Sequence, residues 1–343
     1  MSSDNVILAA NNLLKYYPVN SRGIIFKKRI GDVHAVDNIS FSIKKGETFG
    51  LVGESGCGKT TTAKLILHLE MPDLGQVFFE GKNVTQTVLS GSRADILALR
   101  RKMQYVFQNP YQSLDPRMTV ADIITEPLAI HRHVPKRQWN DRLMELIHLV
   151  GLEDYHTQRY PHEFSGGQRQ RICIARALAV EPELLLTDEP VASLDVSIRA
   201  QILNLLQDLQ NKFGLTYLYI SHDLSTVRHI CHRVAVMYLG KLVEIAGVAE
   251  LYGKPLHPYA EALLSAIPIP DPTGKTRSKR VILRGEVPSP INPPAGCRFH
   301  PRCNYAMDMC RKYEPALEEV KKDHFVACFL HHKTKAKTAA REE

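Results

Sequence analysis

The sequence contains no apolar run long enough to cross a bilayer. A spanning helix needs about 18 or more consecutive apolar residues, whereas the apolar runs of this chain, such as residues 184–186, have the length of a strand. The residues from Met1 to Asn5 also lack the basic segment and apolar stretch of a secretory signal. We therefore expect a chain that does not cross a membrane itself and that stays in the cytosol.

The composition lacks the extremes of disordered or fibrous proteins. Of the 343 residues, 44% are hydrophobic and 23% are charged, which is an ordinary globular balance and enough chain for about two domains. The 44 basic and 36 acidic side chains leave a formal charge of +8. This surplus favours contact with phosphates, nucleic acid or an anionic membrane surface, and does not choose among them.

Hydrophobic periodicity predicts an α/β chain with a helical insertion. Residues 39–43 alternate as in a strand, and a second strand ends at a glycine-rich loop that leads into a helix at 60–68. Further strands at 184–187 and 215–220 alternate with helices at 168–180 and 198–212, which implies a parallel sheet. Residues of about 117–163 read as a helical insertion. A change to proline-rich composition predicts one domain at 1–255 and a separate module at 256–343.

The glycine-rich loop has the pattern of a phosphate-binding P-loop, G-x4-G-K-[ST], between a strand and a helix. Its backbone N–H groups would surround the phosphates, Lys59 would reach the β- and γ-phosphates, and the Thr60 hydroxyl would ligate Mg²⁺. The alternative is a glycine turn with a solvated lysine. The predicted phosphate-binding residues are Gly53, Glu54, Ser55, Gly56, Cys57, Gly58, Lys59, Thr60 and Thr61. The helix N-terminus would lower the thiol pKa of Cys57 and make it sensitive to thiol reagents.

Two further segments carry chemistry. The apolar strand at 184–187 ends in Asp188 and Glu189, where one carboxylate can hold Mg²⁺ and the other can polarise water; alone, it could be an acidic turn. Ser165, Gly166, Gly167 and Gln168 open a helix with exposed N–H groups and form a second candidate anion site. Alone, this segment could equally be an ordinary helix N-cap made by Ser165.

Together these motifs resemble the nucleotide-binding subunit of ABC transporters over roughly residues 6–255, with residues 165–168 as the signature motif. The resemblance implies a P-loop NTPase of ABC type, with a mainly parallel sheet, an antiparallel β subdomain and a helical insertion. It implies ATPase activity with Glu189 as general base and Mg²⁺ held by Thr60, Gln108 and Asp188. Other implied residues are the Q-loop Gln108, the D-loop Asp195, the switch His222, and Tyr17 as the adenine platform with Tyr16 as second choice.

The same resemblance implies assembly. The signature of one subunit would face the P-loop of another, so that two ATP molecules lie between paired subunits, and closure of the pair would drive a permease. Two differences from the common pattern are Phe164 ahead of the signature serine and Cys57 within the P-loop.

The C-terminal residues resemble those of dipeptide and oligopeptide importers. The resemblance rests on segments 257–259, 266–270, 285–290 and 296–303, with support from 111–116. Residues 267–272 resemble the F-type subunit, which implies a related D-type ATPase as partner, two transmembrane permease subunits and, indirectly, an extracytoplasmic substrate-binding protein. It also implies a peripheral location on the cytoplasmic face of the inner membrane. The cargo would be dipeptides or oligopeptides, with nickel or oligosaccharides as the alternative.

Four cysteines near the end are spaced C-x5-C-x6-C-x17-C: Cys297, Cys303, Cys310 and Cys328. Soft thiolates suit an iron–sulfur cluster or zinc, and some resembling importer ATPases carry a [4Fe–4S] cluster there. Zinc, with help from His300 or His324, and reduced cysteines that only pack the module are the alternatives.

Two other classes compete with the importer. A soluble ABC ATPase that acts on nucleic acid or ribosomes usually has two cassettes or a long coiled-coil insertion, and neither is present, so we expect no nucleic-acid partner. A regulatory GTPase needs an Asn-Lys-x-Asp motif to read its base. The Asn-Lys at residues 211–212 is followed by Phe-Gly instead of x-Asp, which excludes that class.

Overall fold

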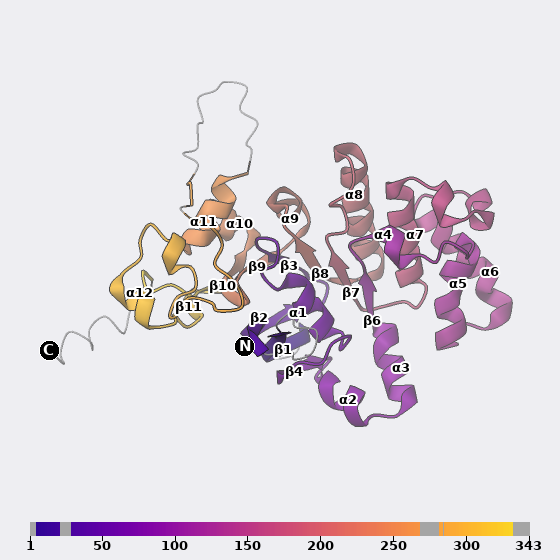
Figure 1. The fold of residues 1–343 in the computed structure, drawn as a ribbon. Helices are drawn as coiled ribbons and strands as arrows, with labels where there is room; N and C mark the ends of the chain where they lie inside the picture. The colour runs from indigo at the N-terminus through magenta and orange to yellow at the C-terminus, as the bar shows by residue number, and fades with distance from the viewer. Residues whose placement is uncertain (1–4, 21–28, 268–280, 284, 332–343) are drawn as a thin grey trace, which may run out of the picture.

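The computed structural model describes residues 5–20, 29–267, 281–283 and 285–331, which form two sheets surrounded by helices (Figure 1). The smaller sheet is antiparallel, with the order β2 (Arg29–Lys44), β1 (Val6–Asn20), β4 (Leu74–Phe79) and β5 (Lys82–Asn83). The larger sheet has the order β11 (Glu318–Lys321), β12 (His324–Val326), β10 (Lys241–Gly247), β9 (Arg233–Tyr238), β3 (Thr48–Val52), β8 (Thr216–Ser221), β7 (Leu184–Asp188) and β6 (Met103–Val106).

The centre of the larger sheet is parallel from β9 to β6, and β10, β12 and β11 extend it in antiparallel pairs. The central strands β3, β7 and β8 are buried at every position and mostly apolar because both faces of the sheet are covered. Leu184 and Leu186 of β7 pack towards α1 (Lys59–Ile66) and the smaller sheet, and Leu185 packs in a second core with α8 (Val196–Phe213) and α9 (Leu224–Ile230). The mainly parallel core and the antiparallel subdomain are thereby confirmed.

A helical lobe forms the end of the molecule opposite the C-terminal module (Figure 1). It contains α4 (Pro110–Ser113), α5 (Val120–His131), α6 (Trp139–Leu149) and α7 (Gly166–Leu178). A capping box between Thr119 and Asp122 begins α5. The helical insertion is thereby confirmed, while α2 (Val84–Ser90) and α3 (Arg93–Lys102) were not predicted. Short 3₁₀ turns lie at Lys136–Gln138, Asp154–Gln158, Pro161–Glu163 and His300–Arg302.

The residues after 255 pack against the core sheet and add strands to it. α10 (Val248–Gly253) and α11 (Pro258–Ser265) follow β10, and after α12 (Asp308–Lys312) the chain returns to pair β12 with β10. The buried Glu244 of β10 accepts hydrogen bonds from the N–H groups of Leu256 and His257 and lies 2.8 Å from His324 Nε2. A domain boundary at 255 stays a prediction. Residues 268–272 of the F-type resemblance lie outside the described residues.

No helix in the described part of the chain combines the length and the apolar character needed to cross a membrane.

Candidate functional site

The P-loop connects the end of β3 to the start of α1. Gly58 has a φ of 111°, and a Cβ there would lie 2.0 Å from the carbonyl oxygen of Ala35, so this position requires glycine. Lys59 is 6% exposed, and its Nζ donates to the carbonyl oxygens of Gly53 and Glu54 at 2.8 and 3.0 Å. Lys59 therefore bridges the two ends of the loop, and the helix α1 begins at this same residue.

A cavity of about 640 Å³ lies over this loop and collects residues from distant parts of the sequence. Besides the P-loop, its walls come from the smaller sheet, the Q-loop, the end of β7 and the segment after β8. The lining residues are Tyr17, Val33, Ala35, Gly53, Glu54, Ser55, Gly56, Gly58, Lys59, Thr60, Thr61, Gln108, Glu189, His222, Leu224 and Leu263.

Asp188 provides a buried carboxylate beside Thr60. Tyr105 donates its hydroxyl hydrogen to Asp188 Oδ2 at 2.8 Å, and the Thr60 side chain also hydrogen-bonds this carboxyl. Within the described structure Asp188 Oδ1 is buried without a hydrogen-bond partner. Burial raises the pKa of Asp188, and the hydrogen bonds from Tyr105 and Thr60 oppose that rise. An unpaired buried carboxylate oxygen next to a threonine hydroxyl suits a hard cation such as Mg²⁺.

Three predicted residues lie together, because Gln108 and His222 both contact the carboxylate of Glu189. Gln108 Nε2 donates to Glu189 Oε2 at 2.9 Å, and His222 Nδ1 lies 2.9 Å from Glu189 Oε1. Glu189 has a φ of 47°, a conformation uncommon for a non-glycine residue and frequent at functional sites. Its N–H donates to the carbonyl of Ile220, which holds the carboxylate at the edge of the sheet.

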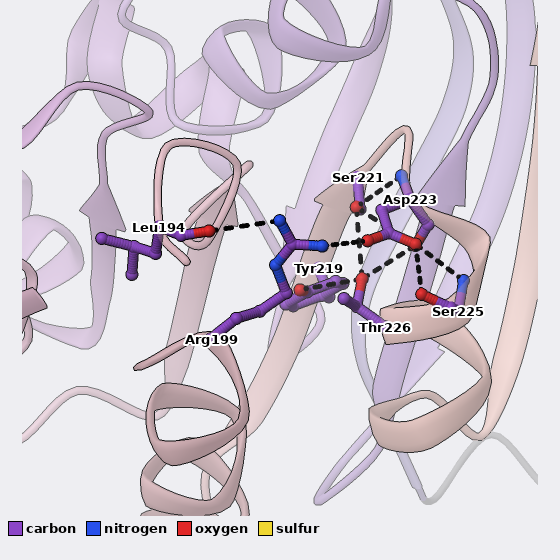
Figure 2. A network of polar contacts seen from close by, with 7 residues as sticks. All are labelled: Leu194, Arg199, Tyr219, Ser221, Asp223, Ser225 and Thr226. Carbon is purple, nitrogen blue, oxygen red and sulfur yellow. Dashed lines mark hydrogen bonds and ion pairs between the residues drawn. The ribbon is translucent and has the colours of Figure 1, made fainter. Parts of the chain in front are cut away.

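Arg199 of α8 links the D-loop to the switch segment (Figure 2). It donates to the carbonyl of Leu194 at 3.2 Å and to Asp223 Oδ2 at 2.8 Å. Asp223 in turn caps α9 by accepting from the Ser225 N–H at 2.9 Å. Asp195 caps α8 by accepting from the Ile198 N–H, which lowers the pKa of Asp195. The segments on either side of His222 and Asp195 are thus fixed to each other.

The signature residues lie at the N-terminus of α7. Ser165 and Gln168 form a capping box, and a Cβ on Gly167 would lie 2.3 Å from Ile198 Cγ2, so the close approach of α8 requires this glycine. Ser165, Gly166, Gly167 and Gln168 are not among the residues that line the P-loop cavity. The structure of one chain therefore does not bring the two candidate anion sites together.

The two tyrosine candidates differ in position. Tyr17 lines the P-loop cavity, and its hydroxyl donates to Glu70; burial raises its pKa to about 12. Tyr16 instead stacks on His34, with ring centroids 3.9 Å apart. Of the two, only Tyr17 lies where a base could stack.

Cys57 does not have the reactive thiol that its helix N-terminal position suggested. The side chain is 4% exposed, and burial raises its pKa, against the smaller effect of Lys59. That prediction is wrong because desolvation outweighs the helix terminus and the lysine.

The four C-terminal cysteines line one small cavity of about 20 Å³. Burial raises the pKa of the Cys297 thiol to about 12 and that of Cys328 to about 11. Across the described residues, no group of three or more His, Cys, Asp or Glu side chains is arranged to hold a metal ion. His300 lines the cavity, whereas His324 does not and contacts Glu244.

A wider groove of about 850 Å³ lies between the core and the helical lobe. Gln108 lines both this groove and the P-loop cavity. Phe107 and Ile130 line the groove and remain exposed. The groove therefore borders directly on the residue that contacts Glu189.

The sequence did not identify Tyr105 or Arg199 as part of this site. Tyr105 could have been found, because it lies in the strand just before the Q-loop and the carboxyl ends of parallel strands meet at one edge. The contact of Arg199 with Asp223 depends on the packing of α8 beside the switch segment, which no local pattern shows.

Comparison with known proteins is consistent with this geometry. A family model described as ABC transporter matches residues 36–192, and one described as the C-terminal region of oligopeptide/dipeptide transporters matches residues 243–310. The oligopeptide transport ATP-binding protein AppF of Bacillus subtilis (strain 168) is 49% identical over 330 residues, covering 96% of this chain and 99% of AppF. The putative oligopeptide transport ATP-binding protein YkfD of the same organism is 50% identical over 318 residues, covering 92% and 94%.

Among solved structures, the ATP-binding cassette MJ0796, as a post-hydrolysis dimer bound to ADP and Pi, matches with a TM-score of 0.61 and 27% identity over 70% of this chain and 98% of its own. The structure of cbiO1 from Clostridium perfringens, part of the transporter complex cbiONQ, matches with a TM-score of 0.60 and 26% identity over 73% and 92%.

Proposed function

The chain belongs to the ABC transporter family, among its oligopeptide-type ATP-binding proteins, and on that premise we propose that it hydrolyses Mg-ATP to drive uptake of dipeptides or oligopeptides through a permease. The observation that carries this proposal is the convergence of Gln108 and His222 on the Glu189 carboxylate at the rim of the P-loop cavity.

The chemistry follows from these positions. Lys59 and the N–H groups of the loop bind the phosphates. Bound Mg²⁺ neutralises developing negative charge on the phosphates, and Thr60, Asp188 and Gln108 are the residues that would hold it. Glu189 accepts a proton from the attacking water, while Gln108 and His222 orient its carboxylate. Tyr17 supports the adenine.

The assembly we propose is a heterodimer with a related D-type ATPase. The signature residues lie outside the P-loop cavity of their own chain, so Ser165 to Gln168 would complete the partner's site and the partner's signature would complete this one. The dimeric cassette MJ0796, similar over 70% of this chain, supports a paired arrangement.

The groove beside Gln108 would receive a short helix from one of two transmembrane permease subunits. Its exposed Phe107 and Ile130 offer apolar contact, and movement there would reach Glu189 through Gln108. The chain would thus sit peripherally on the cytoplasmic face of the inner membrane, and an extracytoplasmic binding protein would deliver the cargo to the permease.

We also propose that the four cysteines hold a [4Fe–4S] cluster with a structural role. Because the described side chains are not arranged as a metal site and their cavity is about 20 Å³, the cysteines would have to move apart to bind it. The four residues line one cavity, and each thiol accepts a backbone N–H. The donors are Phe299 for Cys297, Tyr305 for Cys303, Met307 for Cys310 and Leu330 for Cys328. N–H donors stabilise thiolates and tune clusters. Anaerobically purified chain should contain about four iron atoms; zinc or no metal at all would contradict the cluster.

Affinity purification from native membranes, with mass spectrometry of the bound proteins, tests the importer. Two permease subunits and a related ATPase should be recovered. Recovery of ribosomes or nucleic acid instead would contradict the transport role and leave the ATPase chemistry intact.

A further inference from the structure

The acidic residue of the P-loop, Glu54, is paired with an arginine 248 positions later in the chain. Arg302 donates from Nη1 to Glu54 Oε2 at 2.9 Å and from Nη2 to Oε1 at 3.2 Å. The side chains are 9% exposed for Arg302 and 28% for Glu54. Two parallel hydrogen bonds from one guanidinium give this pair both strength and a defined orientation.

The backbone of Glu54 is held from the same direction. Its N–H donates to the hydroxyl of Tyr259 at 2.9 Å, and Tyr259 of α11 is fully buried against Tyr238 and Phe299. The carbonyl oxygen of Glu54 accepts from Lys59 Nζ at 3.0 Å and from the Cys57 N–H at 3.3 Å. Every polar group of Glu54 is therefore engaged, and residues beyond 255 supply two of its four partner residues.

A second arginine of the module reaches the P-loop indirectly. Arg298 donates to the carbonyl of Leu239 and pairs with Asp37. Gly240, which follows Leu239 in the chain, donates its N–H to the carbonyl oxygen of Cys57 at 2.8 Å. The turn between β9 and β10 is thus held between Arg298 and the P-loop.

An unpaired carboxylate in a phosphate-binding loop repels the triphosphate that the loop must bind. Arg302 neutralises this charge and holds the loop at the same time. We propose that Arg302 is a positioning residue of the ATP site, and that the C-terminal module is thereby part of the nucleotide-binding machinery. This inference rests on the proposed ATPase function, because it concerns how tightly the same P-loop binds Mg-ATP.

The expected effects differ between the two partners of the pair. Arg302→Ala leaves the Glu54 charge uncompensated and should weaken Mg-ATP binding about tenfold, which corresponds to about 1.4 kcal/mol. Arg302→Lys keeps the charge without the planar fork and should weaken binding about threefold. Glu54→Gln removes the repelling charge and leaves the positive charge of Arg302 beside the loop, so the affinity should exceed that of the wild type.

A variant that combines Arg302→Ala with Glu54→Gln distinguishes a role of Arg302 in positioning Glu54 from a role in stabilising the fold alone. If Arg302 acts by neutralising and orienting Glu54, then Arg302→Ala with Glu54→Gln should bind Mg-ATP within about threefold of the wild type. If Arg302 only supports the fold, the double variant should bind as weakly as Arg302→Ala. Arg311→Ala is the matched control, because Arg311 is an exposed arginine of the same module.

The experiment is a titration of each full-length variant with a fluorescent ATP analogue and Mg²⁺, displaced by ATP, with the thermal unfolding midpoint measured in parallel. A wild type that fails to bind ATP would overturn the proposed function itself. With a wild type that binds, an Arg302→Ala affinity within about twofold of the wild type, or no recovery in the double variant, would overturn the role of Arg302. Should Arg302→Ala not fold, Arg302→Lys with and without Glu54→Gln makes the same comparison.

Discussion

The hydroxyl of Tyr105 controls the charge of the carboxylate that we assign to Mg²⁺. It donates to Asp188 Oδ2 at 2.8 Å, and Asp188 is buried. Burial raises the pKa of Asp188, while this hydrogen bond and that of Thr60 lower it. Tyr105→Phe removes one of the two opposing bonds and keeps the ring.

The size of the effect follows from the free energy of this hydrogen bond. A hydrogen bond to a charged acceptor contributes about 1.5–3 kcal/mol, so its loss disfavours the ionised carboxylate. The pKa of Asp188 should therefore rise further, and a protonated carboxyl is a poor Mg²⁺ ligand. We expect the concentration of Mg²⁺ needed for half-maximal ATP binding to rise in Tyr105→Phe, and to rise more at about pH 6 than at about pH 8, by about tenfold at the lower pH for a lost bond of about 1.5 kcal/mol.

The assay is a Mg²⁺ titration of fluorescent ATP binding at both pH values. Tyr217→Phe is the control, because Tyr217 lies in the same sheet and donates its hydroxyl to the carbonyl of Leu206, away from the site. An unchanged Mg²⁺ requirement in Tyr105→Phe, or a change equal at the two pH values, would refute the assignment of Asp188.

Three other substitutions have defined outcomes. Lys59→Ala should abolish Mg-ATP binding in calorimetry, because the lysine closes the loop and meets the phosphates; retained binding contradicts the P-loop assignment. Glu189→Gln should still bind ATP but hydrolyse it at least about a hundredfold more slowly in the assembled transporter, and wild-type turnover would remove its role as base. Glu244→Ala leaves two buried N–H groups and His324 without their acceptor, so it should cost about 3–5 kcal/mol in thermal or denaturant unfolding. Exposed Glu250→Ala is the control, and equal unfolding of the two variants would show that Glu244 does not anchor the module.

The sequence alone predicts the parts of the fold that local pattern controls. The strand, glycine loop and helix around residues 48–66 are visible because the spacing of glycine, lysine and apolar residues is local. The helical insertion is visible from periodicity, and the apolar strand that ends in Asp188 and Glu189 reads directly as a buried parallel strand. The same motifs point to Gln108 and His222, which the structure places against Glu189.

The remainder depends on pairing between distant segments. The long hairpin of β1 and β2 has register shifts and mixed burial, so its alternation is interrupted. The strands β11 and β12 are too short to be predicted from their residues. They form because β12 pairs with β10 and β11 pairs with β12. The contact of Arg302 with Glu54 joins positions 248 residues apart in the sequence, and no local pattern indicates it.

The most direct test of the proposed function is peptide uptake in cells of the source organism that lack this chain. Wild-type protein supplied in trans should restore uptake of a labelled peptide, and Lys59→Ala, made to the same level and recovered with the same permease subunits, should not. Uptake that proceeds equally with Lys59→Ala, or without any copy of the chain, would contradict the claim that ATP bound at this P-loop drives peptide import.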